Sequence, residues 1–324
     1  MMNKPSFDAE QRRIQGAWFT ENLAPNHGYA GAAYRIPPAC RELNLAPSIR
    51  KAADRLFSAK PAIQWHKHAN HGLSSQVCCL NFLLPFAAKP ELLRRWVEHV
   101  TADQASEMLP IESDRAGQPW FVTFEWIGET DHLNEGKQGA PRKRGANATA
   151  ADAAMLYRDV QGRNNLLLIE WKYTERYGQP LNPRGNATRR QRYEHIFRQP
   201  NGPICADAKV ILDELFYEPF YQMLRQQMLA WHTEAGDPQI DRARVLHLSP
   251  SGNRLLHRVT SPGLRRFGDD AFDVFKSLLA NPQDFISMSI EDAFAPLTAW
   301  PEADWYPWLR NRYPSLWAET EVPA

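Results

Sequence analysis

Hydrophobic residues follow strand-like spacing most clearly in the middle of the chain. The run over 166–173 has apolar side chains at both odd and even positions, which is typical of a strand buried on both faces. The segment 153–158 is a second predicted strand, and Gly and Asn residues in 159–165 favour a turn between the two. The pattern therefore predicts a β-hairpin at the centre of the fold.

Further elements are predicted on both sides of this hairpin. Ser74 offers an N-cap and Pro85 a stop for an apolar helix. Other helices are predicted over 47–58, 90–101, 208–231 (as two helices or one kinked near Pro219) and 272–279, and strands over 118–127 and 245–249. This order indicates an α/β fold in which helices flank a mixed central sheet.

The length and composition suit such a fold. With 324 residues, 43% of them hydrophobic, the chain can bury a substantial core. We expect an N-terminal extension over 1–60, a core over 61–260, and a C-terminal helical and aromatic extension packed on the core over 261–324. The 38 Lys and Arg residues nearly balance 37 Asp and Glu, so any surface that binds nucleic acid must be local.

Cysteine usage and hydropathy argue against several protein classes. Cys40, Cys78, Cys79 and Cys205 include no CxxC pair and no zinc-finger histidine spacing. Residues 1–15 lack the apolar segment of a secretion signal, and no run approaches the roughly 18 apolar residues of a membrane span. We therefore expect a reduced, cytoplasmic protein without a membrane anchor.

The predicted hairpin carries the residues with the clearest chemical meaning. Glu170 and Lys172 point to the same face because side chains alternate along a strand, and the preceding strand can bring Asp152 close to both. Two carboxylates can share a hard cation such as Mg²⁺ or Mn²⁺. A lysine side chain can orient or deprotonate the attacking water and stabilise the charge that develops on the phosphate. These residues predict a metal-dependent phosphodiesterase centre.

The D-(x)17-ExK spacing, with an apolar strand directly before ExK, resembles the motif of the PD-(D/E)xK (restriction-endonuclease-like) nuclease superfamily. The surrounding sequence is similar to a poorly characterised bacterial branch of this superfamily over about residues 65–250. The similar segments are 74–76, 124–125, 149–152 and 168–175. The resemblance implies a restriction-endonuclease-like sheet and a Mg²⁺-dependent nuclease of restriction-like or defence-associated type. Its expected substrate is nucleic acid, with DNA favoured.

Two positions depart from the superfamily pattern. Ala151 replaces a proline that contributes no metal ligand, and Gln76 lies in the first core helix where many relatives carry an acid. Either Gln76 supplies a neutral oxygen to the metal shell, or a carboxylate from Glu125 or Glu135 completes it. Alternatively, the Gln76 amide only bonds core backbone groups, and the site shrinks to three residues.

Two basic segments flank the hairpin in sequence, within the predicted loops 128–147 and 177–192. Phosphate contacts by Arg and Lys supply most nonspecific affinity for nucleic acid, although a charge run is commonly a solvated face. The candidate nucleic-acid contacts are Arg142, Lys143, Arg144, Arg184, Arg189, Arg190 and Arg192.

Purely structural explanations compete with these assignments. The Glu170 and Lys172 pair could be a solvated strand pair, and Asp152 could cap a turn. Three histidines could bind a metal but are more simply surface or cap residues, namely His66, His68 and His71. Four aromatic residues could stack on bases, although packing in the core is favoured, namely Trp305, Trp308, Tyr313 and Trp317.

The rival function is a catalytically inactive nuclease-fold module that binds nucleic acid or a protein partner. Gln76 is the residue that suggests it. The oligomeric state is open, with a homodimer as one option.

Overall fold

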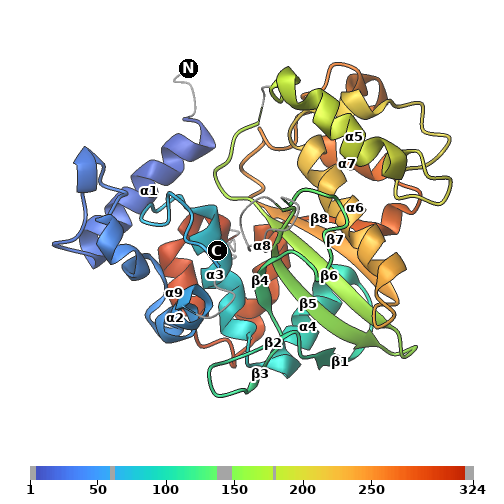
Figure 1. Cartoon of the computed structure of the whole chain (residues 1–324). Coiled ribbons are helices and arrows are strands. Elements are labelled where there is room, and N and C mark those ends of the chain that lie inside the picture. Colours follow the sequence, from blue (N-terminus) through green and yellow to red (C-terminus); the bar gives the residue numbers. More distant parts are fainter. Residues whose placement is uncertain (1–4, 59–62, 137–147, 178–179, 318–324) are drawn as a thin grey trace, which may run out of the picture.

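A computed structural model describes residues 5–58, 63–136, 148–177 and 180–317. A six-stranded mixed sheet lies at its centre in the order β1-β5-β6-β7-β8, with β4 also paired with β5 (Figure 1). Its strands are β1 (Ala105–Leu109), β4 (Thr123–Trp126), β5 (Ala151–Asp159), β6 (Asn164–Trp171), β7 (Arg242–Ser249) and β8 (Phe285–Ser289). A two-stranded ribbon of β2 (Glu112–Ser113) and β3 (Pro119–Trp120) is separate.

The predicted hairpin is confirmed. β5 and β6 pair antiparallel from Ala153 opposite Ile169 to Arg158 opposite Asn164. Gly162 adopts a φ of +82° in the connecting turn, a conformation that favours glycine. β6, β7 and β8 then pair in parallel, so the sheet is mixed and the predicted fold class is confirmed.

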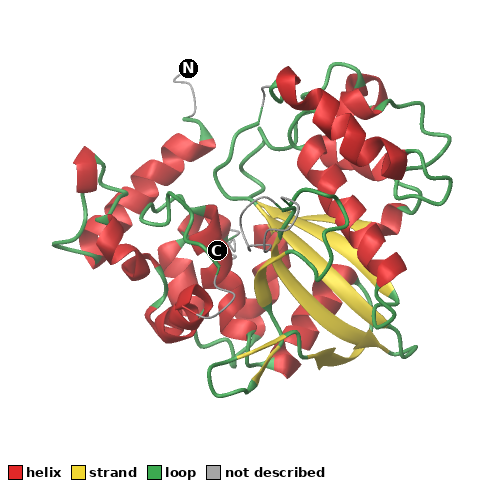
Figure 2. Cartoon of the chain, viewed as in Figure 1, coloured by secondary structure: helices red, strands yellow, loops and turns green. Residues whose placement is uncertain are grey.

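Helices cover both faces of the sheet (Figure 2). One face packs against α3, α4 and α8, and the other packs against α5, α6 and α7. The α-helices are α1 (Phe7–Asn22), α2 (Arg50–Ser58), α3 (Ser75–Leu83), α4 (Pro90–Thr101), α5 (Asn186–Phe197), α6 (Phe220–Gly236), α7 (Ala271–Ser277), α8 (Ile290–Phe294) and α9 (Tyr306–Arg312). Both faces of β6 are therefore buried, which explains its continuous apolar sequence.

The helix expected after Ser74 is present as α3. The Ser74 side chain accepts a hydrogen bond from the Val77 amide at 3.3 Å, and the helix ends at Leu83, just before Pro85. Its buried residues surround the whole helix, including the polar Gln76. This arrangement brings an amide group into the interior beside the sheet.

Two expectations about elements were wrong. The segment 118–127 is not one strand, because β3 pairs with β2 and the chain then changes partner so that β4 pairs with β5. The predicted loop 177–192 contains the start of α5, which buries only Tyr193, Ile196 and Phe197 and so has little apolar periodicity. By contrast, the expected interruption of 208–231 near Pro219 is present, because a short 3-10 helix covers Leu212–Leu215 and α6 begins directly after Pro219.

The C-terminal aromatic residues belong to the packed interior. Trp305 and Tyr313 are buried in the core cluster that also contains residues of α3 and α4, and Trp308 and Trp317 pack against it. The core-packing alternative is therefore confirmed for Trp305 and Tyr313. Among the helices of the described ranges, none combines the length and apolar composition that a bilayer crossing requires.

Candidate functional site

Asp152, Glu170 and Lys172 meet where β5 begins and β6 ends. The Trp171 amide donates a hydrogen bond of 2.7 Å to Asp152 Oδ2, and Lys172 Nζ forms an ion pair with Glu170 Oε1. The side chains of Glu170 and Lys172 are buried. The hairpin thus brings together the three residues that the sequence motif singled out.

The electrostatics of this cluster are dominated by buried negative charge. Burial and the neighbouring Glu170 carboxylate raise the pKa of Asp152 well above its ordinary value, although Lys172 partly offsets this. Burial alone would lower the pKa of Lys172, but Glu170 and other negative neighbours raise it well above its usual range. Lys172 is therefore an ammonium group at neutral pH, suited to orienting an anion or a water rather than accepting a proton.

Gln226 is a site residue that the sequence motif did not reveal. Its Nε2 donates to Glu170 Oε2 at 2.8 Å and to the Ala150 carbonyl at 2.6 Å. Glu170 shares the face of β6 that packs against α6, which explains why this helix supplies the partner. The available sequence signal was a pair of amides, Gln226 and Gln227, inside an apolar helix.

Gln76 reaches the site through Glu125. Its Nε2 donates to the Gln64 carbonyl at 2.9 Å and to Glu125 Oε1 at 3.2 Å, and its Oε1 accepts from the His66 amide at 2.9 Å. Gln76, Glu125 and Asp152 also line one cavity of about 10 Å³. A cavity of this size has room for about one water molecule. Gln76 therefore makes hydrogen bonds to backbone groups and also lies beside Asp152.

Glu125 is held in a strained conformation opposite Asp152. Its φ is +49°, a value that costs a residue other than glycine about 1–3 kcal/mol. Phe124 pairs with Ala153 and Trp126 with Ala151, so Glu125 lies across from Asp152 in the sheet. Such strain is concentrated at functional sites, and here it accompanies a buried carboxylate.

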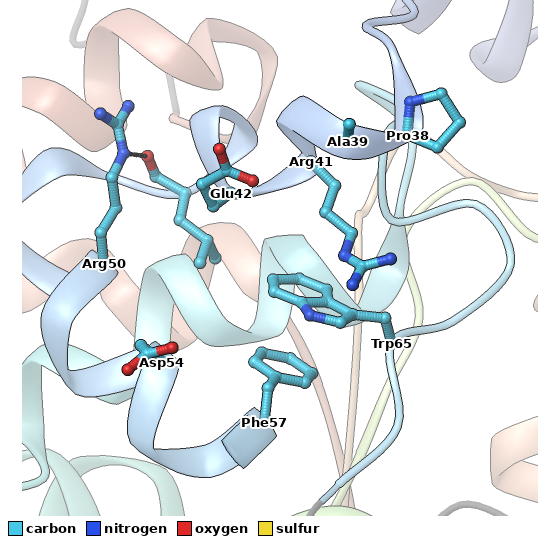
Figure 3. Close-up of a pocket in the computed structure, with 9 residues that line it drawn as sticks. Pro38, Ala39, Arg41, Glu42, Arg50, Asp54, Phe57 and Trp65 are labelled. Carbon is cyan, nitrogen blue, oxygen red and sulfur yellow. Dashed lines mark hydrogen bonds between the residues drawn. The ribbon is translucent and has the colours of Figure 1, made fainter.

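His66 lies beside Glu125, with its Nε2 atom 3.0 Å from Glu125 Oε1. The neighbouring Trp65 stacks on Phe57 with ring centroids 3.5 Å apart, and the Arg41 guanidinium lies over the indole (Figure 3). These contacts, in a separate pocket of about 490 Å³, anchor the segment that carries His66. His66 is thus exposed but attached to the carboxylate cluster.

Glu135 belongs to a different cluster. Its carboxylate pairs with Arg225 at 3.0 Å and accepts hydrogen bonds from the Tyr193 hydroxyl and the Thr149 hydroxyl. Burial alone would raise the pKa of Glu135, but Arg225 and these hydrogen bonds lower it below its ordinary value. Glu125, not Glu135, lines the small cavity together with Asp152.

The Glu135–Arg225 pair gives a stability prediction. Arg225→Met should lower the free energy of unfolding by about 3 kcal/mol, because it leaves the buried Glu135 carboxylate without its cation. Chemical denaturation at pH 7 measures this loss. The lowered pKa means that the stabilisation is present above the ordinary carboxyl pKa and disappears as the pH falls through the folded value. The double variant Glu135→Gln/Arg225→Met should lose clearly less, and an equal loss would contradict the prediction.

The basic candidates are only partly available for a ligand. Arg142, Lys143 and Arg144 lie outside the described residues. Arg189 donates to the Asn182 carbonyl and lies over Phe216 and Tyr221, and Arg190 pairs with Asp213. Arg184 is exposed and Arg192 half-buried.

A divalent cation suits the carboxylates that are present. Within the described ranges, no group of three or more His, Cys, Asp and Glu side chains is arranged to hold a metal. Mg²⁺, however, commonly uses one or two carboxylates and keeps several waters. The half-buried Asp152 carboxylate is repelled by both Glu170 and Glu125, and a divalent cation would relieve this charge imbalance.

Comparison with known proteins identifies one family. The family described as "Restriction Endonuclease associating with ARP" (REase-ARP) matches residues 11–314. Neither the curated proteins nor the solved structures that were searched contain a match. The matched range includes the whole central sheet and every strand that carries a candidate carboxylate. The chain therefore belongs to the REase-ARP family of restriction-endonuclease-like nucleases.

Proposed function

We propose that the protein is a Mg²⁺- or Mn²⁺-dependent nuclease that hydrolyses phosphodiester bonds in DNA. The observation that carries the proposal is the convergence of Asp152, Glu170 and Lys172 at the end of the β5–β6 hairpin, in a chain of a restriction-endonuclease family. DNA as the substrate rests on the family description and on the resemblance of the motif.

Asp152 and Glu170 would hold the cation, and Glu125 with the Gln76 carbonyl would complete its surroundings. When bound, a divalent cation polarises the phosphate and lowers the pKa of a bound water. Gln226 fixes the Glu170 carboxylate by donating to Oε2, which leaves Oε1 facing Lys172. The Lys172 ammonium positions the attacking water and offsets the charge that develops on the phosphate.

Cleavage should depend completely on a divalent cation. The purified protein should cut at least one of supercoiled, linear or single-stranded DNA with Mg²⁺ or Mn²⁺, and excess EDTA should abolish cutting, because the carboxylates alone repel phosphate. Gel analysis of the three substrates, with RNA alongside, measures this. A Lys172→Ala preparation controls for contaminating nuclease. The nuclease proposal fails if neither DNA nor RNA is cut, or if Lys172→Ala cuts equally well. Cutting of RNA alone would overturn DNA as the substrate.

A second candidate is an inactive module that binds nucleic acid or a protein partner. Gln76 favours it, because the superfamily that the motif resembles has an acid at this place in many members. Calorimetric titration separates the two functions. The nuclease should bind Mn²⁺ in a manner that Asp152→Asn removes, whereas the inactive module should show no binding that depends on Asp152.

A further inference from the structure

We propose that a groove between α1, the segment 66–75 and the residues after β6 binds the phosphate backbone of the nucleic acid substrate. This inference rests on the proposed function. It adds the surface along which the nucleic acid strand binds, which the sequence motifs did not indicate. The groove has a volume of about 510 Å³. Its charged and polar lining includes Arg12, Arg35, Arg176, His66, His68 and Glu175.

The groove carries a net positive charge. Its three arginines face two carboxylates, Asp8 and Glu175, which leaves one positive charge in excess. The largely buried Asp8 carboxylate pairs with both Arg12 and Arg176, whose side chains are 53% and 52% exposed. Glu175 turns its carboxylate to the Tyr173 amide at 2.6 Å. Arg12 and Arg176 thus stand nearer the solvent than the Asp8 carboxylate that they share, as a phosphate-binding surface requires.

Aromatic contacts hold two of these arginines in place. The guanidinium groups of Arg12 and Arg35 each lie 5.8 Å from the centre of the Tyr34 ring. Arg35 Nε also donates to His71 Nε2 at 2.7 Å, and His71 packs edge-on against Tyr34. Burial and the neighbouring Arg35 lower the pKa of His71 to about 4, so this imidazole is a neutral acceptor. Guanidinium groups restrained in this way lose less freedom when they bind a phosphate.

The groove adjoins the carboxylate cluster at three points. His66 lines the groove and contacts Glu125. Ser75 lines it and donates at 3.2 Å to the carbonyl of Trp171, the residue between Glu170 and Lys172. Glu175 lines it and acts electrostatically on Lys172. A strand whose phosphate lies at Lys172 would therefore continue into this groove.

The basic residues of the 184–192 region are less suited to the same task. Arg190 is neutralised by Asp213, and Arg189 is bonded to Asn182 and Asn186. In the groove, by contrast, two arginines share one buried carboxylate. The groove is the better candidate because its positive charge lies directly beside the proposed centre, which three of its lining residues contact or act on electrostatically.

The test measures binding separately from cleavage. Full-length Asp152→Asn protein is titrated in EDTA against a fluorescently labelled DNA duplex, by anisotropy at several salt concentrations. Adding Arg12→Gln and Arg176→Gln should weaken binding at least about 10-fold and reduce the salt slope by about 0.9 for each phosphate that the protein no longer neutralises. Adding Asp8→Asn instead should tighten binding, because it removes the anion that the two arginines share.

The matched control is Arg115→Gln/Arg158→Gln, also in the Asp152→Asn background. These solvent-accessible arginines each pair with one carboxylate and do not line the groove, so this variant should bind within about twofold of its parent with an unchanged slope. Thermal melting confirms that each variant is folded. The groove proposal would be overturned by any of three results: unchanged binding by the Arg12/Arg176 variant, weaker binding by the control alone, or no DNA binding by the parent. If the groove variants behave as expected but the wild-type protein cuts no nucleic acid with Mg²⁺ or Mn²⁺, the DNA-binding groove is supported and the proposed nuclease function is contradicted.

Discussion

Asp152→Asn is expected to abolish DNA cleavage and, at the same time, to stabilise the metal-free protein. Loss of a ligand to the cation should slow cleavage by roughly 1,000-fold, equivalent to about 4 kcal/mol of transition-state stabilisation. The amide oxygen can still accept the hydrogen bond from the Trp171 amide. The substitution removes a carboxyl group whose ionisation is disfavoured by desolvation and by repulsion from Glu170 and Glu125, so the free energy of unfolding should rise.

The pH dependence provides a control for this prediction. Because the folded-state pKa of Asp152 is raised, the folded protein binds a proton that the unfolded chain has already released. Metal-free stability should therefore fall as the pH rises above the ordinary carboxyl range, and Asp152→Asn should flatten this dependence. Urea denaturation in EDTA at several pH values measures it. A variant that is less stable than wild type at neutral pH would contradict the charge-repulsion argument.

Lys172→Met should have the opposite effect on stability. It leaves the buried Glu170 carboxylate without its ion-pair partner, which should cost about 3–5 kcal/mol. Cleavage should fall by about 100- to 1,000-fold, because a preorganised positive group beside the phosphate is removed. Denaturation and single-turnover cleavage assays measure the two effects.

The double variant Glu170→Gln/Lys172→Met separates stability from activity. Replacing the ion pair by two neutral side chains should recover most of the stability, since neither buried charge is left unpaired. Cleavage should stay as low as in the single variant. Recovery of cleavage together with stability would mean that Lys172 is only structural.

The hairpin was predictable because its signals are local. A strand buried on both faces has a nearly continuous apolar sequence, and the Gly162 turn is marked in the sequence. Two other strands of the sheet were missed for the opposite reason. β1 exposes Ser106 and Glu107, and β8 fully buries only Phe285, so neither presents a long apolar run. Edge strands of this kind depend on tertiary pairing more than on composition.

The candidate site was only partly visible for a related reason. The ExK spacing reflects strand geometry, which places Glu170 and Lys172 on one face. Gln226 lies 56 residues from Glu170, and such a separation leaves no periodic signal in the sequence. Glu125 and Glu135 appeared equivalent because the packing of Arg225 against one of them arises only in the folded chain. The roles of these residues in catalysis stay predictions.

The contacts between the two ends of the chain bear on how the protein forms during synthesis. Trp18 Nε1 in α1 bonds Asn311, 293 residues later, and Gln15 bonds the carbonyl of Arg312. At about 5–20 residues per second, a ribosome needs roughly 15–60 s to make the intervening chain. During that time two buried aromatic residues of α1, Trp18 and Phe19, lack their contact with Arg312 of α9. Apolar residues that stay exposed during synthesis are bound by chaperones, which prevent aggregation. The yield of folded protein in a host cell should therefore depend on the chaperone concentration.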